Sequence, residues 1–235
     1  MPLIRPAVLF ALLAAAANVW AARPMVTDDA RIVDPKSCQV ESWVRHDRHG
    51  PYEFWAVPSC NVADNFEISV GGNQQQQAGT GRLADSLMQA KTVLRPVRAN
   101  DWGLAVSVWR SVERGLESGS RDVASYNLNM PVTRSLRDDA LLLHVNAGLR
   151  QDRVERRTYG TWGLGSELLL RDRVQLISEV YGESGSRPYV HGGLRYWLIP
   201  DRVQIDTTLG AQTRFGSGGR WFTIGVRVLS PAFLP

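Results

Sequence analysis

Apolar and polar residues alternate with a period of two along most of the chain after residue 38. Leu141, Leu143 and Val145, for example, alternate with residues that would lie on the opposite face of a strand. Such alternation predicts β-strands, and helical periodicity is essentially absent from this part of the chain. The predicted strands cover residues 39–45, 52–57, 66–71, 88–95, 103–109, 125–130, 141–150, 161–168, 174–181, 190–198, 203–209 and 221–228. These twelve segments predict an all-β fold.

The connections between the predicted strands alternate between short and long. The short ones are Asn61–Asn65, Arg98–Asp101, Arg134–Asp139, Arg171–Arg173 and Pro200–Arg202. The long ones are His46–Pro51, Asn73–Ser86, Val112–Ala124, Gln151–Thr158, Glu183–Arg187 and Gln212–Arg220. Short turns on one rim and long loops on the other, around an even number of strands, are typical of a transmembrane β-barrel. This arrangement places both termini of the barrel on the rim with the short turns.

The two faces of the strands favour a membrane barrel over a soluble one. The apolar face carries no charge in the ten clearest strands, whereas the other face is rich in Gly, Asn, Gln and paired charges. Small and amide side chains suit a confined, wet lumen better than an open surface. Aromatic residues at or near strand ends predict the girdles of a membrane interface; they are Trp102, Tyr159, Trp162, Tyr189, Trp197 and Trp221. We therefore predict a closed, antiparallel, up-and-down transmembrane β-barrel of about 12 strands.

The chain divides into three parts. Residues 1–21 have the features of a secretory signal peptide, with a positive charge at Arg5 and a short apolar stretch over Val8–Ala17. Residues 22–37 form a leader rich in charge, and residues 38–235 form the barrel. The leader either enters the lumen as a small plug or remains a loose periplasmic tail. Export predicts the outer membrane of a Gram-negative bacterium, with outer-membrane lipid, lipopolysaccharide and the barrel-assembly machinery as partners.

Charge and cysteine content narrow the picture further. The 235 residues include 27 basic and 23 acidic ones, a formal net charge of +4. This small excess of positive charge does not indicate a protein that binds nucleic acid. Cys38 opens the first predicted strand and Cys60 closes the second, so a disulfide across the end of one hairpin is predicted. No cysteine or histidine spacing typical of zinc accompanies them, and we expect neither a metal nor a cofactor.

Four stretches carry a family resemblance. They are Arg23-Pro24 with Thr27–Ala30, Gln89–Thr92, Tyr196–Gln204 and Leu229–Pro235. Together they resemble uncharacterised proteobacterial outer-membrane β-barrels and, more distantly, the meta-pathway phenol-degradation outer-membrane family. The resemblance implies a barrel with an unassigned or transport-like role, and it assigns a function to no single residue. Barrels of this kind usually end on an aromatic residue, whereas Phe233 lies two residues before the end of this chain.

Charged residues on the predicted inward face are the candidates for a lumen or constriction site. They are Lys91, Arg95, His144, Glu167, Glu179, His191, Arg195, Asp206 and Arg227. Their signs alternate on neighbouring strands between Glu179 and Arg227, which predicts a ladder of salt bridges inside the barrel. Such a ladder either only neutralises confined charges or selects small solutes by charge and size. We predict the passive passage, or the binding, of a small solute.

Two other functions stay open at this point. A soluble, exported β-barrel or β-sandwich that binds a ligand would share the signal peptide, the disulfide and the alternation. An outer-membrane lipid hydrolase or acyltransferase would need a nucleophile beside a histidine. His144 is the tempting base, but Ser166 and Ser178 fall on the opposite, lipid-facing phase. We therefore expect the protein not to be an enzyme.

An arginine cluster at the start of one long loop predicts a lipid contact. Arg153, Arg156 and Arg157 are candidates for binding the phosphates of lipid A, because a guanidinium group matches phosphate geometry. In the alternative interpretation the loop is simply solvated, and Asp152 and Glu155 balance its charge.

Overall fold

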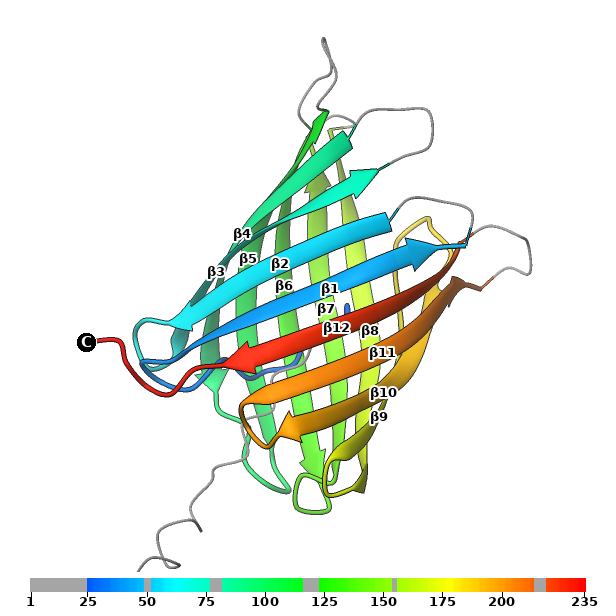
Figure 1. Cartoon of the computed structure of the whole chain (residues 1–235). Coiled ribbons are helices and arrows are strands. Elements are labelled where there is room, and N and C mark those ends of the chain that lie inside the picture. Colours follow the sequence, from blue (N-terminus) through cyan, green and yellow to red (C-terminus); the bar gives the residue numbers. More distant parts are fainter. Residues whose placement is uncertain (1–24, 49–51, 77–81, 116–122, 154–155, 214–218) are drawn as a thin grey trace, which may run out of the picture.

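The computed structural model describes residues 25–48, 52–76, 82–115, 123–153, 156–213 and 219–235. Twelve antiparallel strands pair with their sequence neighbours, and the first pairs with the last to close one barrel (Figure 1). They are β1 (Cys38–Asp47), β2 (Tyr52–Asn61), β3 (Phe66–Gln76), β4 (Arg82–Arg95), β5 (Trp102–Gly115), β6 (Val123–Leu136), β7 (Leu141–Asp152), β8 (Arg157–Arg171), β9 (Val174–Glu183), β10 (Tyr189–Ile199), β11 (Val203–Gln212) and β12 (Arg220–Leu229). The predicted fold class and number of strands are confirmed. The predicted signal peptide lies outside the described residues.

The apolar rows of the strands point outward and the polar rows point into the barrel. In β12, for example, Phe222 and Ile224 are exposed, whereas Thr223 and Arg227 are buried. Throughout the described residues, the buried side chains are mostly polar or charged, and most of the exposed large ones on the strands are apolar. A water-soluble barrel has the reverse arrangement. The exterior therefore suits lipid, and the interior is a polar lumen. No helix among the described residues is long and apolar enough to cross a membrane.

The connections define two different ends of the barrel. The turns after β2, β4, β6, β8 and β10 lie on the same rim as the start of β1 and the C-terminal residues, and we call this the short-turn rim (Figure 1). The opposite end is the long-loop rim. Parts of the segments predicted as long loops are strand instead, because β3, β4 and β5 extend further toward this rim. The outward row of β5 changes there from Val108 to Arg110, so alternation could not mark the end of the strand.

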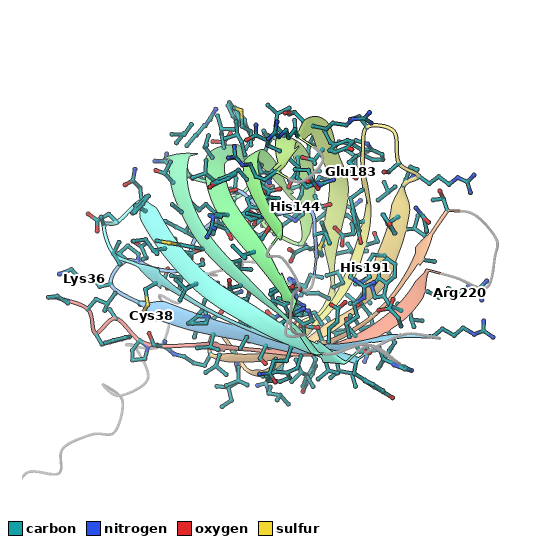
Figure 2. All side chains as sticks on the ribbon, turned by 90° about the horizontal axis from the view of Figure 1, so that it is seen from above. Lys36, Cys38, His144, Glu183, His191 and Arg220 are labelled. Atoms are coloured by element: carbon teal, nitrogen blue, oxygen red, sulfur yellow. A yellow bond between two sulfur atoms is a disulfide. The ribbon has the colours of Figure 1, made fainter. Side chains whose placement is uncertain are left out.

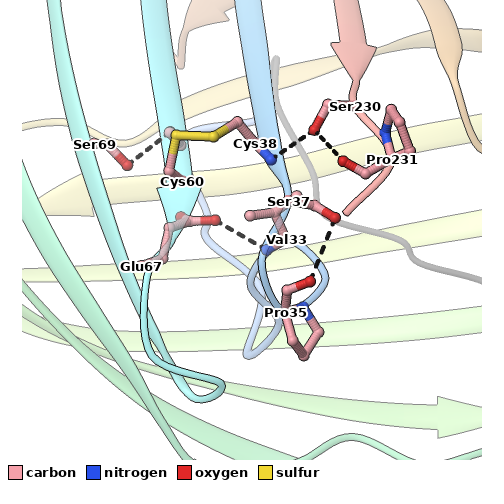
Figure 3. Close-up of a disulfide and its surroundings, with 10 residues drawn as sticks. Val33, Pro35, Ser37, Cys38, Cys60, Glu67, Ser69, Ser230 and Pro231 are labelled. Atoms are coloured by element: carbon pink, nitrogen blue, oxygen red, sulfur yellow. Dashed lines mark hydrogen bonds between the residues drawn. A yellow bond between two sulfur atoms is a disulfide. The ribbon is translucent and has the colours of Figure 1, made fainter. Parts of the chain in front are cut away.

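The first hairpin is closed covalently at the short-turn rim. Cys38 and Cys60 lie directly opposite each other on β1 and β2, with Cα atoms 4.1 Å apart, and form a disulfide (Figure 3). The predicted disulfide is confirmed. The backbone N–H of Cys38 also donates to Oγ of Ser230 at 2.9 Å. The beginning of β1 is thus tied both to β2 and to the segment that follows β12.

The aromatic residues do not all form the predicted girdle. Trp102 and Trp162 are exposed on the outer surface, as predicted. Trp197 and Trp221 are instead buried, because each lies in the inward phase of its strand. Trp197 packs with Val33 and Leu229 in a small apolar cluster inside the barrel. Tyr159 and Tyr189 lie in the inward phase as well, where the ring of Tyr189 is 5.8 Å from that of Trp221. The girdle prediction is therefore wrong for these four residues, and the lumen contains flat apolar surfaces as well as polar ones.

Candidate functional site

In the described part of the leader, residues 25–37, the stretch 25–33 lies inside the barrel and residues 34–36 are exposed. The leader adjoins β1 at the short-turn rim, and its residues contact lumen side chains of strands on several sides of the barrel. Met25, Ala30 and Val33 are at most 3% exposed. The leader is thus packed within the lumen rather than along its edge.

Lumen side chains accept hydrogen bonds from the leader backbone. The N–H groups of Val26 and Thr27 donate to the two carboxylate oxygens of Glu179, at 2.9 and 2.6 Å. Three further N–H groups find partners at 2.8–2.9 Å: Asp28 donates to Asn146, Ala30 to Thr133, and Val33 to Glu67. A buried backbone without secondary structure needs such partners, because each unpaired polar group costs free energy. The inward polar residues therefore replace the ladder that a neighbouring strand would provide.

Two asparagine side chains complete this pattern. The side-chain amide of Asn146 donates to the carbonyl of Asp28 at 2.7 Å, so Asn146 both accepts from and donates to the same leader residue. The side-chain amide of Asn61 donates to the carbonyl of Val33 at 2.8 Å. Since these contacts come from side chains, the leader could leave the lumen without breaking any strand pairing of the barrel.

Charges anchor the middle of the leader. The ammonium group of Lys91, on β4, lies 2.9 Å from Asp28 and 3.3 Å from Asp29, and the side chain of Lys91 is 5% exposed. Arg31 extends in the other direction and pairs with Asp139 at 3.2 Å. An ion pair removed from water depends strongly on both partners, because a lone buried charge is costly. Lys91 is therefore a side chain whose loss should strongly weaken docking of the leader.

Two glycines of β8 make room for the leader. A Cβ atom at Gly163 would lie 2.6 Å from Oγ1 of Thr27, and one at Gly165 would lie 2.5 Å from Cε of Met25. Both positions face the lumen, where a larger side chain would meet the leader. Their small size is a requirement of the close approach of the two segments.

A buried charged cluster lies beside the leader. The carboxylate of Glu167, on β8, pairs with Arg195 and lies 3.4 Å from Nε2 of His144. Arg227 donates to Gln39 at 2.8 Å and lies 3.7 Å from Glu41. These partners differ from the order Glu179, Arg195, Asp206, Arg227 that the sequence predicted for the ladder. Arg227 is paired instead with residues of β1 on its other side, where Glu41 lies directly opposite it, and Arg195 reaches past β9 to Glu167 on β8.

Arg95 departs from its predicted place. The other eight candidate lumen residues are buried inside the barrel, and Figure 2 shows His144 and His191 pointing into it. A register shift between Val93 and Arg95 moves Arg95 out of the inward phase. Its side chain is 41% exposed, lies 4.0 Å from the ring centre of Trp102, and pairs with Asp101 at 2.9 Å. The backbone N–H of Trp102 and the charge of Arg95 hold the pKa of Asp101 below its ordinary value.

Glu179 is oriented by a chain of hydrogen bonds. Nδ1 of His191 lies 2.7 Å from Glu179, and Nε2 contacts the hydroxyl of Thr208, which in turn contacts Thr223. This order of groups resembles a nucleophile, a base and an orienting acid, but Thr208 is 1% exposed and meets another hydroxyl. The geometry fixes the carboxylate that holds the leader. Ser166 and Ser178 lie on the outer surface of the barrel, where their hydroxyls are 2.8 Å apart. His144 points into the lumen, so neither serine can contact it.

Cavities lie on both sides of the leader. One of about 670 Å³ opens beside residues 30–35 near the short-turn rim, where Asn65 and Pro96 line it. Two others, of about 310 and 280 Å³, lie on the long-loop side of the leader and are both lined by Val26 and Trp109. The leader thus separates a cavity at one end of the barrel from cavities at the other. Among the residues that the structure places, no group of three His, Cys, Asp or Glu side chains could hold a metal ion.

Sequence reasoning missed the residues that pair with the leader backbone. Asn61, Glu67, Thr133 and Asn146 were not among the candidates, although each lies in the inward phase of a strand. The inward amides were visible in the sequence as part of a face rich in Gly, Asn, Gln and paired charges. Their role could be found only by knowing which segment they face.

The arginine cluster lies at the long-loop rim. Arg153, Arg156 and Arg157 are exposed, and the guanidinium of Arg153 lies 5.8 Å from the ring centre of Tyr126 on the outer surface. Glu155 lies outside the described residues. The contact with lipid A stays a prediction.

The barrel, its inverted polarity and its polar lumen define the class of porin-like outer-membrane β-barrels. More particularly, the chain belongs to the family described as uncharacterised conserved protein UCP029691, which matches residues 8–229. No curated protein sequence matches the chain. The distant resemblance to the meta-pathway phenol-degradation family stays a prediction.

Solved structures share the fold at low sequence identity. KdgM porin in complex with disordered oligogalacturonate is 12% identical, with a TM-score of 0.63 over 81% of this chain and 98% of that chain. NanC porin is 12% identical, with a TM-score of 0.59 over the same shares of both chains. Outer membrane phospholipase A from Escherichia coli, as an active-site mutant, is 10% identical, with a TM-score of 0.52 over 86% and 93%. Likeness at this level concerns the fold alone.

Proposed function

We propose that the protein is an outer-membrane channel for small solutes whose lumen is narrowed by its own leader, which acts as a plug. The observation that carries this proposal is the way in which the leader is held. Side chains bind it along its length, and cavities lie on both of its sides. These side-chain contacts can separate without the loss of any strand pairing, which suits a segment that moves.

The size of the barrel supports the same function. About eight strands fill their own interior with side chains, whereas 16 to 18 leave an open aqueous channel. Twelve strands lie between these limits, and here the interior accommodates one extended segment. Movement of the leader would open a continuous polar path between the two rims. The charged lumen residues, Lys91 and Glu179 among them, would then set the preference of the path for ions.

Single-channel conductance in a planar bilayer tests this function. The intact protein is compared with Lys91→Met, which leaves the buried Asp29 without its cation and should release the leader. Arg95→Met is the matched control, because Arg95 lies on the same strand but outside the lumen. We expect a clearly larger conductance for Lys91→Met, and the same conductance for Arg95→Met as for the intact protein.

Each result separates one part of the proposal from another. Equal conductance of the intact protein and Lys91→Met would contradict the role of the leader as a plug. Folded barrels that stay silent in all forms, including one lacking residues 25–35, would contradict the channel itself. Dependence on detergent and a heat-modifiable mobility on gels would support the proposed location in the outer membrane.

The arginine cluster carries a separate and finer proposal. Exposed guanidinium groups at the long-loop rim would meet the phosphates of lipopolysaccharide in the outer leaflet. Replacing Arg153, Arg156 and Arg157 together by Gln should weaken binding of purified lipid A, and unchanged binding would contradict the contact.

A further inference from the structure

Two adjoining cavities lie between the leader and the long-loop rim, and together we call them the vestibule. Their volumes are about 310 and 280 Å³, and both are lined by Val26, Trp109, Asn129 and Tyr181. Val26 is 59% exposed, so the leader forms part of the floor of the vestibule without filling it. The vestibule is large enough for a small organic molecule.

Aromatic rings from five strands form much of the vestibule wall. Trp43, Trp55, Trp109, Tyr181 and Trp221 line the larger cavity. Trp43 and Trp55 are partners across β1 and β2, and their rings stack at 5.5 Å. Large aromatic residues are unexpected on the inward face of a water-filled barrel, which elsewhere carries small, amide and charged side chains. Their presence indicates a surface that binds something flat or weakly hydrated.

Two arginine side chains of the protein already form cation–π contacts with aromatic rings in or beside the vestibule. The guanidinium of Arg45 lies 4.6 Å from the ring centre of Trp221, and that of Arg150 lies 4.8 Å from the ring centre of Tyr159. Each is also ion-paired: Arg45 bonds Asp47 at 3.0 Å, and Arg150 bonds Glu183 at 2.9 Å. The faces of aromatic rings attract cations, and these contacts show the attraction at work in this part of the lumen. Arg45 and Arg150 both line the vestibule, and each already has a carboxylate partner.

Glu53 is the acidic residue of the vestibule that lacks a cation. It lies opposite Arg45 in the register of β1 and β2, yet Arg45 pairs with Asp47 instead. The carboxylate of Glu53 accepts a hydrogen bond from the indole N–H of Trp55 at 3.2 Å. Within the described ranges, no Lys, Arg or His side chain forms an ion pair with Glu53. A carboxylate beside stacked indoles, without a cation of its own, is complementary to a positively charged ligand.

We propose that the vestibule binds small organic ammonium ions. The carboxylate of Glu53 balances the charge of the ligand, and the indoles of Trp55 and Trp109 cover its alkyl groups. This inference rests on the proposed function and deepens it, since it names cations as the class of solute gathered above the leader. A neutral sugar or an organic anion is the competing ligand. The two arginines that line the vestibule, Arg45 and Arg150, each have a carboxylate partner, so they attract an anion less strongly than an unpaired guanidinium would.

Isothermal titration calorimetry on the folded, full mature chain tests the proposal. The probe is choline, and its neutral isostere 3,3-dimethylbutan-1-ol has the same shape without the charge. A polyoxyethylene detergent avoids choline, amine-oxide and sugar headgroups that would compete. We expect choline to bind about tenfold more tightly than the isostere, and we expect no binding of glucose or gluconate.

Variants locate the binding in the vestibule. Glu53→Gln and Trp109→Leu should each weaken choline binding about tenfold. Trp102→Leu is the matched control, because Trp102 lies on the same strand as Trp109 but on the outer surface at the short-turn rim. It should leave choline binding unchanged. Circular dichroism and gel mobility confirm that each variant is folded before titration.

The outcomes separate this inference from the proposed function. Three results would overturn the inference that the vestibule binds ammonium ions. They are equal binding of choline and its isostere, tighter binding of glucose or gluconate than of choline, and choline binding that is unchanged in Glu53→Gln. Binding is measured at equilibrium and needs no open pore. A protein that conducts but does not bind choline would overturn only this inference, and one that binds choline but never conducts would overturn only the channel.

Discussion

The half of the lumen that contains the leader and the half toward the long-loop rim differ in how deeply their charged side chains are buried, although the same alternating strands form both. Near the leader, charged side chains are buried almost completely, and Glu167 and Arg195 are each 1% exposed. Toward the long-loop rim, ion pairs are open to water, and Arg150 and Glu183 are each 28% exposed. The first half holds the leader, with a cavity of about 670 Å³ beside residues 30–35, and the second half contains two cavities lined partly by aromatic rings. The difference shows that alternation defines the wall of a barrel, whereas its contents depend on which residues occupy the inward phase.

The largest expected effect comes from breaking a buried pair. Glu167→Gln leaves Arg195 buried without its carboxylate and should lower the free energy of unfolding by about 3–5 kcal/mol. The matched change Glu183→Gln, in the open half, should cost about 1 kcal/mol or less. Urea unfolding of both variants in detergent or vesicles measures the difference. Equal losses would show that the two halves are not distinct in the way described.

The disulfide should have the next largest effect. The double variant Cys38→Ser with Cys60→Ser removes a link across 22 residues and should lower the free energy of unfolding by about 3 kcal/mol. Reduction of the intact protein should reproduce this loss. An unchanged unfolding midpoint after complete reduction would contradict a stabilising role for the bond at the short-turn rim.

Glycine variants test how closely the leader approaches the wall. Gly163→Ala places a methyl group against Thr27 and should cost about 1–3 kcal/mol or displace the leader. Gly160→Ala is the matched control on the same strand, since its Cβ would approach no atom closer than 4.0 Å. Conductance and unfolding are measured for both. If the two alanines behave alike, the leader does not pack against β8 as described.

The smallest expected effect concerns an exposed ion pair at the short-turn rim. The N–H of Trp102 and the charge of Arg95 lower the pKa of Asp101 below its ordinary value of 3.8. A lowered pKa in the folded state gives stability that is present above the ordinary value and is lost as the pH falls through the lowered one. The stabilities of the intact protein and Asp101→Asn should therefore differ slightly at neutral pH and converge in acid. A difference that persists in strong acid would contradict this cause.

The wall of the barrel could be predicted from the sequence because lipid imposes a period of two. Strands such as β7 and β12 keep an uninterrupted outward row, so their faces were readable. The alternation could not predict the register shift at Arg95 or the extension of β4 and β5 toward the long-loop rim, because no lipid-facing pattern marks these features. The inward phase of Trp197 and Trp221 was present in the alternation but conflicted with the expectation of an aromatic girdle.

The contents of the lumen were harder to predict for a physical reason. The leader has no periodicity, and its partners, such as Asn146 and Glu179, lie more than 100 residues away in sequence. Long-range pairing of a side chain with an irregular backbone leaves no local signal. Eight of the nine charged candidates were nevertheless placed correctly in the lumen, because a charge in the inward phase of a membrane strand is conspicuous, whereas the buried Glu41 and Glu67 were missed.

The central claim, that the leader is packed inside the lumen, is tested most directly by cysteine labelling. Ala30→Cys and Val26→Cys are made separately in the folded protein, where the native cysteines are joined as a disulfide. Ala30 is 0% exposed and Val26 is 59% exposed toward the vestibule. A water-soluble maleimide should label Val26→Cys readily and leave Ala30→Cys protected until the barrel is unfolded. Equally fast labelling of both positions in the folded barrel would contradict the account.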